Sequence, residues 1–292
     1  MGKEKKRFGD RKDGRLIREL DPMHFITPLL YPNRCDNEAY ISVNVDLENI
    51  NRYVDRLNEQ DPEFRYTMFH IIVVAIIKVL TLRPKMNRFI ANKNFYQRNE
   101  VSASFVVKKR FDDHAEEGLA FIHAKPESTL FTLMDDLKRQ ITTVKSQGAV
   151  DASSDAMDLF NKMPRFFSKF IVWIITRLDV HGWVPKSLIA TDPYYSSVVL
   201  SNLGSIKLKS GYHHLTNWGT CSLFCIIGEK KMTPVYDEDG NVTMRQTLDL
   251  GLTVDERLAD GYYYSKSIRL LKHLLQNPEL LELPVSEEVQ YE

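Results

Sequence analysis

The part of this sequence that most limits how the chain can fold is residues 247–276, where a strand pattern, a sharp turn and a helical pattern follow one another directly. Thr247 to Thr253 alternates and predicts a strand. Asp260-Gly261 predicts a sharp turn, because glycine adopts dihedral angles that other residues avoid. Tyr262 to Gln276 predicts a helix whose apolar stripe is Ile268, Leu271, Leu274 and Leu275. We therefore expect a domain that contains both strands and helices.

The rest of the chain also mixes strands with helices. Thr67 to Leu82 is apolar on all sides, so we expect a central buried helix, and this helix is too short to span a membrane. Two more helices are expected, at Leu47–Asn58 with Asp46 as its cap and at Ser128–Lys145. Strands are expected at Tyr40–Val45, Phe95–Gln97, Val101–Lys108, Leu119–His123, Ser196–Leu200 and Thr220–Gly228, with a hairpin over Thr233–Asn241. This order predicts an α/β fold, an α+β two-layer sandwich with a mixed sheet and packed helices, rather than alternating βαβ units.

Three stretches carry little regular pattern. Residues 16–40 are expected to be irregular, because Pro22, Pro28 and Pro32 interrupt any helix. Residues 1–15 are charged and lack the apolar centre of a signal peptide, so we interpret them as a solvated tail. Residues 146–156 are rich in Ser, Ala and Asp and predict a loop. We expect a charged N-terminal tail over 1–20 and a single domain over 21–288.

Composition argues against several classes of function. The 39 basic and 39 acidic residues cancel, whereas nucleic-acid binding usually requires a basic excess. Cys35, Cys221 and Cys225 form no paired framework, and we expect them to be buried structural thiols, which suits a reducing cytoplasm. No His or Cys spacing indicates a metal site. We expect a cytoplasmic protein with no transmembrane segment, no metal and no nucleic-acid partner.

Residues 164–178 predict a second notable helix. Its wide apolar face consists of Phe166, Phe167, Phe170, Ile171, Ile174, Ile175 and Leu178, and its polar positions include Arg165, Lys169 and Arg177. One interpretation is a helix that lies on a membrane surface, or a lid. The other interpretation is a helix packed into the core, and this is the one we expect.

Residues 253–261, Thr-Val-Asp-Glu-Arg-Leu-Ala-Asp-Gly, resemble a known active-site signature. Dihydrolipoamide acyltransferases, the catalytic cores of 2-oxo acid dehydrogenase complexes, carry Asp-His-Arg-x-x-Asp-Gly, and chloramphenicol acetyltransferases share it as His-x-x-x-Asp-Gly. The residues of this chain in register with the signature are Asp255, Arg257, Asp260 and Gly261. Glu256 stands where the family has its catalytic histidine.

Two other segments carry the same resemblance. Ser201-Asn202-Leu-Gly204 is similar to the family turn whose serine donates a hydrogen bond to the oxyanion of the tetrahedral intermediate. Pro84-x-x-Asn87 follows the buried helix and precedes two strands, as in the family. The resemblance extends over about residues 25–285 and is weakest between 145 and 190.

The resemblance implies a chloramphenicol-acetyltransferase-like fold and transfer of an acyl group from coenzyme A to a small-molecule acceptor that it does not identify. It implies a homotrimer with the site between subunits. Coenzyme A or acyl-coenzyme A would then lie along the Ser201–Gly204 turn, with Asn202 and Gly204 as contacts, and near Glu256. No glycine-rich phosphate loop is present, so Lys or Arg side chains would meet the pyrophosphate. No lipoyl-carrying domain or lipoyl attachment is expected, which leaves a lone catalytic-type domain.

The residue that acts as general base stays open. The family base is a histidine, which suits that role because its pKa lies near operating pH. Glu256 is either a base in a suitable pocket or only an ion-pair partner of a nearby arginine. His214, next to His213, is either a replacement base or a residue of a surface loop. For Asp260 the resemblance implies pairing with an arginine beneath the turn, and Asp255 and Arg257 are candidates for the same kind of pair.

Two functions of different classes therefore remain. The chain is either a coenzyme A-dependent acyltransferase with an altered base, or a non-catalytic relative that keeps the trimeric fold for ligand binding or assembly. Glu256 is the feature that distinguishes them.

Overall fold

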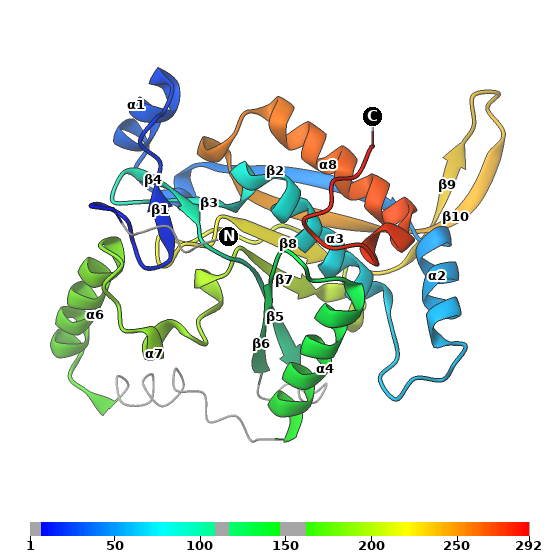
Figure 1. The fold of residues 1–292 in the computed structure, drawn as a ribbon, viewed down its shortest axis with the longest axis horizontal. Coiled ribbons are helices and arrows are strands. Elements are labelled where there is room, and N and C mark those ends of the chain that lie inside the picture. Colours follow the sequence, from blue (N-terminus) through cyan, green and yellow to red (C-terminus); the bar gives the residue numbers. More distant parts are fainter. Residues whose placement is uncertain (1–6, 109–116, 147–161, 292) are drawn as a thin grey trace.

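The structure, a computed structural model, describes residues 7–108, 117–146 and 162–291. Within these residues the centre of the molecule is a seven-stranded sheet with strand order β2-β10-β8-β7-β5-β6, to which β9 is added as a hairpin with β10 (Figure 1). β7 is parallel to β5 and β8, and the other pairs are antiparallel, so the sheet is mixed, as predicted. The strands are β2 Glu38–Asp46, β5 Val101–Lys108, β6 Glu117–Ala124, β7 Val198–Asn202, β8 Leu223–Ile227, β9 Lys231–Tyr236 and β10 Val242–Asp255.

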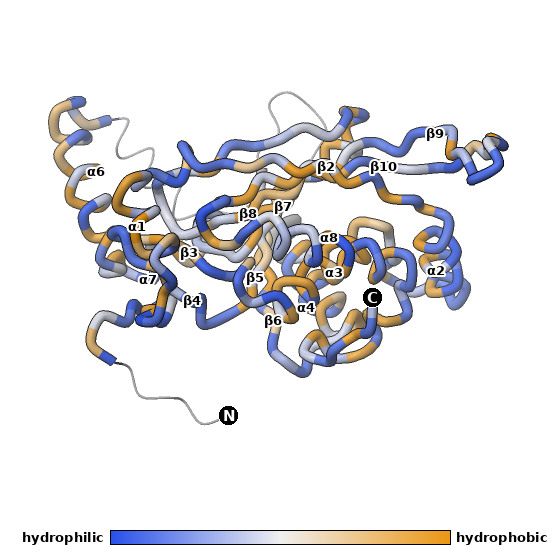
Figure 2. The backbone as a smooth tube through the Cα atoms, turned by 90° about the horizontal axis from the view of Figure 1, so that it is seen from above, coloured by the Kyte–Doolittle hydropathy of each residue, from blue (hydrophilic) through white to orange (hydrophobic). Residues whose placement is uncertain are grey.

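Helices cover one face of this sheet. The helices are α3 Met68–Leu82, α4 Leu130–Ser146 and α8 Gly261–Gln276, with α2 Glu48–Asn58 beyond them, and Figure 2 shows them on the same side of the strands. The expected α/β two-layer fold is therefore confirmed. The other face of the sheet is crossed by the segment between β7 and β8.

The central position expected for α3 is confirmed. Its residues from His70 to Leu80 are buried. Lys78, which interrupts the apolar run, is fully buried, and its ammonium group donates to the carbonyl oxygens of Leu280 and Pro284, both at 3.0 Å. Burial without these acceptors would cost several kcal/mol, so the segment after α8, with the 3-10 turn η6 Pro278–Leu281, completes the environment of α3.

The N-terminal part of the chain differs from the prediction at two points. A helix, α1 Pro22–Leu30, forms in the stretch expected to be irregular, because Pro22 occupies its first turn, where no backbone donor is needed, and Asp21 caps it. The expected solvated tail is folded from Arg11 onward, since Arg11 is buried and β1 Gly14–Leu16 pairs with β4. The small sheet β1-β4-β3 includes β3 Arg88–Ala91 and β4 Asn94–Arg98, and the 3-10 turns η1 Arg34–Asp36 and η2 Pro84–Asn87 lie in the same half of the chain.

The segment before β7 also departs from expectation. α6 Arg165–Val180 forms where a helix was predicted, but it is not packed into the core, because Asp179 is its only buried residue. α7 Lys186–Ile189 and the 3-10 turn η3 Pro193–Tyr195 follow it. The loop predicted at 146–156 lies almost entirely outside the described residues.

Of the three cysteines, two behave as expected. Cys221 and Cys225 are buried, and desolvation raises the pKa of Cys225 to about 12. Cys35 is exposed, so the expectation that it is buried was wrong. It lies in η1, next to Arg34, whose side chain is the buried one of that turn.

Candidate acyl-transfer site

The signature residues form the turn between β10 and α8. β10 ends at Asp255, a single 3-10 turn, η5 Glu256–Leu258, follows, and α8 begins at Gly261. The Asp260 carboxylate caps α8 by accepting a hydrogen bond from the Tyr263 amide at 2.7 Å. The strand, the tight turn and the helix start therefore follow the sequence prediction, and Asp260 has the structural role of a helix cap.

Beneath this turn lies a buried cluster of charges. Arg257 donates to both oxygens of the fully buried Asp255 carboxylate, from Nε at 2.8 Å and from Nη2 at 2.6 Å. Arg34 approaches the same carboxylate at 3.9 Å. Burial lowers the pKa of the Arg34 guanidinium, and the Asp255 charge opposes that effect. The pairing of Asp255 with Arg257 is confirmed, whereas pairing of Asp260 with an arginine stays a prediction.

The cluster ties the turn to segments far away in the sequence. Arg257 donates to the carbonyl oxygen of Tyr31, just after α1, at 2.6 Å. Arg34 donates to the carbonyl oxygens of Thr216 and Gly219, which lie between β7 and β8. The Tyr264 hydroxyl donates to the Asp255 carbonyl at 2.8 Å, and burial raises the pKa of this hydroxyl. The backbone of the turn is thus held on three sides.

Glu256 itself is exposed above this buried cluster. Its amide donates to the Asn37 carbonyl at 3.0 Å, which fixes the backbone. Its side chain lines a surface cleft of about 650 Å³, together with Asp260, Tyr264, Arg269 and Lys272. The lining of the cleft thus includes two acidic residues, Glu256 and Asp260 before α8, and two basic residues, Arg269 and Lys272 on α8.

Ser201 and its turn lie at the end of β7. The Asn202 side chain accepts from the Ser205 amide at 3.3 Å and so shapes the 3-10 turn η4 Leu203–Ile206. Gly204 packs directly on the backbone of β8, since a Cβ there would lie 2.5 Å from the Gly228 carbonyl oxygen. Both residues predicted to contact the cofactor thus have a role within the turn, and any contact with coenzyme A is additional.

The two histidines lie in the segment that crosses the sheet face opposite α3, α4 and α8. The His213 ring stacks on Phe224 of β8, with centroids 4.4 Å apart. Each ring places Nδ1 next to a backbone carbonyl, that of His214 at 2.8 Å and that of Leu215 at 3.1 Å. Because a carbonyl oxygen only accepts, Nδ1 carries the proton, and Nε2 of a neutral ring is left with its lone pair. His214 is the more exposed of the two.

Sheet register separates Ser201 from Glu256. Ser201 pairs with Ile226, and Ile226 pairs with Gly251, so these three residues form one row across β7, β8 and β10. Glu256 lies five residues after Gly251, just past the end of β10 and about 16 Å away along the strand direction. Ser201 lies two strands across from Gly251, about 10 Å away. The two residues are thus roughly 20 Å apart in one chain. A single chain cannot bring them to one reacting carbonyl.

Several residues at this end of the sheet carried no sequence signal. Arg34 lies in a proline-rich stretch, and Glu38 accepts both from the Tyr40 hydroxyl and from the Leu215 amide. Arg269 and Lys272 were identifiable in principle, because they follow Ser265 at helical spacing on one side of α8. In the part of the chain that the structure describes, no group of three or more His, Cys, Asp or Glu side chains is placed to hold a metal ion.

A second cavity, of about 310 Å³, lies away from this turn and contains none of the predicted site residues. It is lined by Arg11, Arg98, Asp179, Tyr195 and residues near them. Of the helices in the described ranges, each is too short or too polar to cross a bilayer.

Residues 186–283, which contain both the serine turn and the signature, match the model of a known family, 2-oxoacid dehydrogenases acyltransferase (catalytic domain). No curated protein sequence matches the chain. The fold is similar to that of a probable dihydrolipoamide acetyltransferase from Listeria monocytogenes, with a TM-score of 0.58 and 12% identity over 96% of this chain and 99% of the other. The resemblance stated from the signature is thus confirmed.

Two further structures have the same fold. The cubic core of a pyruvate dehydrogenase multienzyme complex has a TM-score of 0.59 and 14% identity, over 91% of this chain and 95% of the other. A chloramphenicol acetyltransferase has a TM-score of 0.55 and 10% identity, over 90% of this chain and 99% of the other. At these identities the similarity establishes the fold, which is chloramphenicol-acetyltransferase-like.

Proposed function

We propose that this chain, an acyltransferase catalytic-domain sequence on a chloramphenicol-acetyltransferase-like fold, transfers acyl groups from coenzyme A with an altered general base. The observation that carries the proposal is the separation of Ser201, on β7, from Glu256, just after β10, which the strand register sets at roughly 20 Å in one chain. Such a pair serves one reaction only when the serine of one subunit meets the signature turn of another. This is the arrangement that the family resemblance implies.

The chemistry would need two groups of the protein, a general base and the Ser201 hydroxyl. A base removes the proton from the acceptor thiol or hydroxyl as it attacks the thioester carbonyl. The Ser201 hydroxyl donates to the oxyanion that forms, which is worth a few kcal/mol in enzymes of this type. The tetrahedral intermediate then collapses, and the coenzyme A thiolate leaves and takes up the proton held by the base. This scheme assigns a role only to the base and to the Ser201 hydroxyl, and no metal ion takes part in a step.

Two side chains compete for the role of base. Glu256 occupies the position of the family histidine and lines the cleft, but it is exposed beside Arg269 and Lys272. His214 has its Nδ1 held by a carbonyl and its Nε2 free to accept a proton. The carbonyl contact at Nδ1 favours His214 as the base, whereas the place of the family histidine in the signature favours Glu256.

The same cleft supports coenzyme A as the acyl donor. Arg269 and Lys272 are cations on its rim, and side-chain cations are what a chain without a glycine-rich phosphate loop must use for pyrophosphate. Asn202, on the serine turn, would contact the pantetheine arm from the other subunit.

We propose a homotrimer on the same grounds. α1 exposes Met23, Phe25, Leu29 and Leu30 and carries no charged side chain, and it is joined to the signature turn through the bond from Arg257 to Tyr31. An uncharged apolar helix at the edge of a site that is incomplete in one chain is a suitable subunit contact.

The second candidate function is a non-catalytic relative that keeps this assembly for ligand binding. The exposure of Glu256 favours it, because a solvated carboxylate is a much weaker base than a histidine. In that case the chain would bind coenzyme A without turning it over.

A calorimetric titration with coenzyme A tests the proposal. We expect saturable binding that weakens as salt is raised, and weaker binding by an Arg269→Gln/Lys272→Gln variant than by an Arg52→Gln/Arg56→Gln control on α2, whose side chains are exposed. Binding together with thiol release from acetyl-coenzyme A in a panel of acceptors would support the enzyme, and binding without release would support the second candidate. No binding by the folded wild type would refute both.

A further inference from the structure

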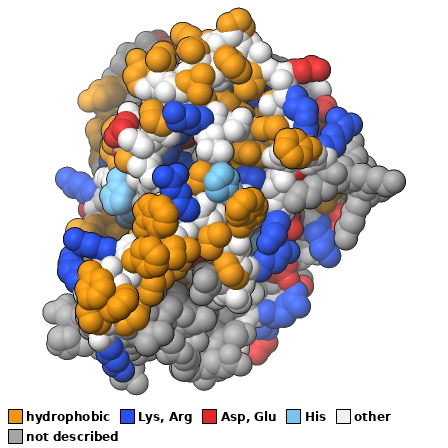
Figure 3. All heavy atoms as spheres, turned by 90° about the vertical axis from the view of Figure 1, so that its left-hand side faces the viewer, with side chains coloured by type: hydrophobic (Ala, Val, Ile, Leu, Met, Phe, Trp, Pro, Cys, Tyr) orange, Lys and Arg blue, Asp and Glu red, His pale blue; other side chains and the backbone are white. Residues whose placement is uncertain are grey.

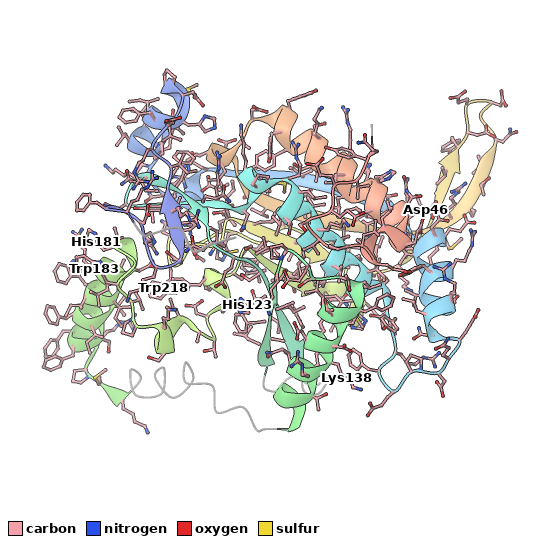
Figure 4. All side chains as sticks on the ribbon, viewed as in Figure 1. Asp46, His123, Lys138, His181, Trp183 and Trp218 are labelled. Atoms are coloured by element: carbon pink, nitrogen blue, oxygen red, sulfur yellow. The ribbon has the colours of Figure 1, made fainter. Side chains whose placement is uncertain are left out.

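α6 presents an exposed aromatic surface that the acyl-transfer site does not use. Phe166, Phe170 and Trp173 follow one another at helical spacing and are 65%, 58% and 57% exposed, and Trp183 just beyond the helix is 63% exposed. Phe170 stacks on Trp173 with ring centroids 6.1 Å apart. Figure 3 shows two groups of hydrophobic side chains on this face of the molecule, and in Figure 4 Trp183 lies at the edge of the ribbon beside α6. We call Phe166, Phe167, Phe170, Trp173 and Trp183 the α6 aromatic surface.

Within the described residues 162–183, the exposed charged side chains that border this surface are basic. The residues Lys162, Arg165, Lys169 and Arg177 are all exposed. The Arg177 guanidinium lies 5.9 Å from the Trp173 ring centroid, so charge and aromatic ring are adjacent. The one acid between 162 and 183 is Asp179, which is buried. A partner that covers the helix must therefore tolerate aromatic rings and be negatively charged.

In the part of the chain that the structure describes, hydrogen bonds anchor the helix through its last turn. The Asp179 carboxylate accepts from the Tyr195 hydroxyl at 2.6 Å and from the Gly219 amide at 3.1 Å. Arg11 donates to the carbonyl oxygens of Asp179 and Val180. The first three turns, which contain the aromatic rings, project from this anchor with one half-buried stripe, formed by Ser168, Ile171, Ile175 and Leu178, against the domain. The outward stripe is therefore fixed in direction.

Charge distinguishes α6 from the other exposed apolar helix. α1 carries no charged residue and suits a contact between subunits. Two copies of α6 packed against each other about a two-fold axis would bring the same basic residues together, which is unfavourable. A bilayer with anionic headgroups offers both features that α6 requires, because aromatic rings settle at the boundary of headgroups and acyl chains and Lys and Arg bind the anionic surface.

We propose that α6 is an interfacial helix that holds the protein on an anionic lipid surface, with the α6 aromatic surface in the headgroup region and Lys162, Arg165, Lys169 and Arg177 on lipid phosphates and carboxylates. The helix has 16 residues and is about 24 Å long. It lies along the membrane plane and does not cross it. Acyl transfer in solution needs none of these residues, so the surface is independent of the proposed function.

Co-sedimentation of the full-length protein with vesicles tests this. The probes are vesicles of phosphatidylcholine alone and of phosphatidylcholine with about a third phosphatidylserine. We expect binding to the anionic vesicles, a decrease on addition of salt, and a blue shift of tryptophan emission, because Trp173 and Trp183 are exposed whereas the ring nitrogen of Trp218 is bonded to Asp192. No binding of the wild type to anionic vesicles would overturn the proposal.

Two variants distinguish the contribution of the aromatic rings to vesicle binding from that of the basic side chains. Phe170→Ser/Trp173→Ser should reduce the partition coefficient about tenfold or more, and Arg165→Gln/Lys169→Gln should reduce it roughly thirtyfold, since each charge near an anionic surface contributes about fivefold. Met232→Ser/Tyr236→Ser, on the equally exposed β9, is the matched control and should bind as the wild type does. Unchanged binding of both α6 variants would refute the proposal. A lower mass of the Phe170→Ser/Trp173→Ser variant than of the wild type in light scattering would also refute the proposal, because it would mean that α6 contacts a second copy in the wild-type protein.

Discussion

Arg257 holds both carboxylate oxygens of Asp255 beneath the signature turn, and neither residue is accessible to water beyond a few per cent of its surface. Removing one partner of a buried pair leaves an uncompensated charge, which typically costs about 3–5 kcal/mol. We therefore expect Asp255→Asn, which keeps the shape, to lower the free energy of unfolding by about that amount in urea denaturation.

A surface pair gives the contrast for this measurement. Asp46 pairs with Arg245 at 2.7 Å, and both side chains are partly exposed. Asp46→Asn should cost about 1 kcal/mol or less. If Asp255→Asn and Asp46→Asn lowered the free energy of unfolding by equal amounts, the burial of the pair of Asp255 and Arg257 would be contradicted.

The identity of the base is tested by turnover. We expect the wild type to acetylate chloramphenicol and dihydrolipoamide poorly, since a positioned general base is worth about two to four orders of magnitude in rate. Glu256→His should raise turnover if the rest of the site is intact. Initial rates of thiol release from acetyl-coenzyme A measure both.

Should the wild type instead turn over at roughly 1–1000 per second, the non-catalytic candidate is refuted. Glu256→Gln and His214→Gln then decide between the bases, because only loss of the true base abolishes the rate. The neighbour His213, stacked on Phe224, provides the control His213→Gln.

The oligomeric state is the third prediction. In light scattering at micromolar concentration we expect about three times the chain mass of 33.9 kDa. Phe25→Ser/Leu30→Ser on α1 should lower this mass, because it removes exposed apolar area from the proposed contact. A wild-type mass equal to that of one chain would contradict the proposed trimer. It would also contradict the proposed site shared by Ser201 of one subunit and Glu256 of another.

The fourth prediction concerns a backbone contact on the sheet face opposite α3, α4 and α8. A Cβ at Gly251 of β10 would lie 1.9 Å from the Gly211 carbonyl oxygen, whereas a Cβ at Gly211 would meet nothing within 4 Å. Gly251→Ala should therefore destabilise the protein by about 1–3 kcal/mol, as overpacking does, and displace the segment that carries His213 and His214. Gly211→Ala should stay within about 0.5 kcal/mol of the wild type. Thermal unfolding measures both, and a reversed order would show that this segment does not lie on β10.

The fifth prediction concerns pH. His70, at the start of α3, accepts from the Thr67 amide at 3.0 Å, and burial lowers its pKa to about 4. In the unfolded chain histidine titrates near 6.5, so the unfolded state binds more protons between these values. The contribution of His70 to the free energy of unfolding amounts to about 3 kcal/mol at most. It is fully present above pH 6.5 and is lost as pH falls towards 4.

His70→Gln isolates this effect. Glutamine still accepts at this position of a capping box but does not titrate. The unfolding free energies of wild type and variant should differ by a constant amount above pH 7 and converge or cross as pH falls from 6.5 to 4. Parallel curves over that range would mean that His70 is accessible to protons when folded.

Periodicity allowed much of the fold to be predicted, because it reports which side of an element is apolar. α3, α8 and β5 follow their expected ranges for that reason, whereas β10 Val242–Asp255 extends well beyond the strand expected at Thr247–Thr253. The helix α1 was missed because proline was counted as a breaker, although Pro22 falls in a first turn and Asp21 provides the cap. α6 was expected in the core, and its exposure shows that an apolar stripe does not specify what covers it.

The sequence by itself determined the signature turn, the serine turn and the family that they resemble, since each is a run of neighbouring residues whose chemistry is local. Only the tertiary structure decided their separation, because the distance between Ser201 and Glu256 follows from β7 lying parallel to β8 and β10 antiparallel to it. The same holds for Arg34, whose partners Asp255, Thr216 and Gly219 are more than a hundred residues away in the sequence. Strand order and buried charge pairing depend on contacts between distant segments, and local pattern carries no information about them.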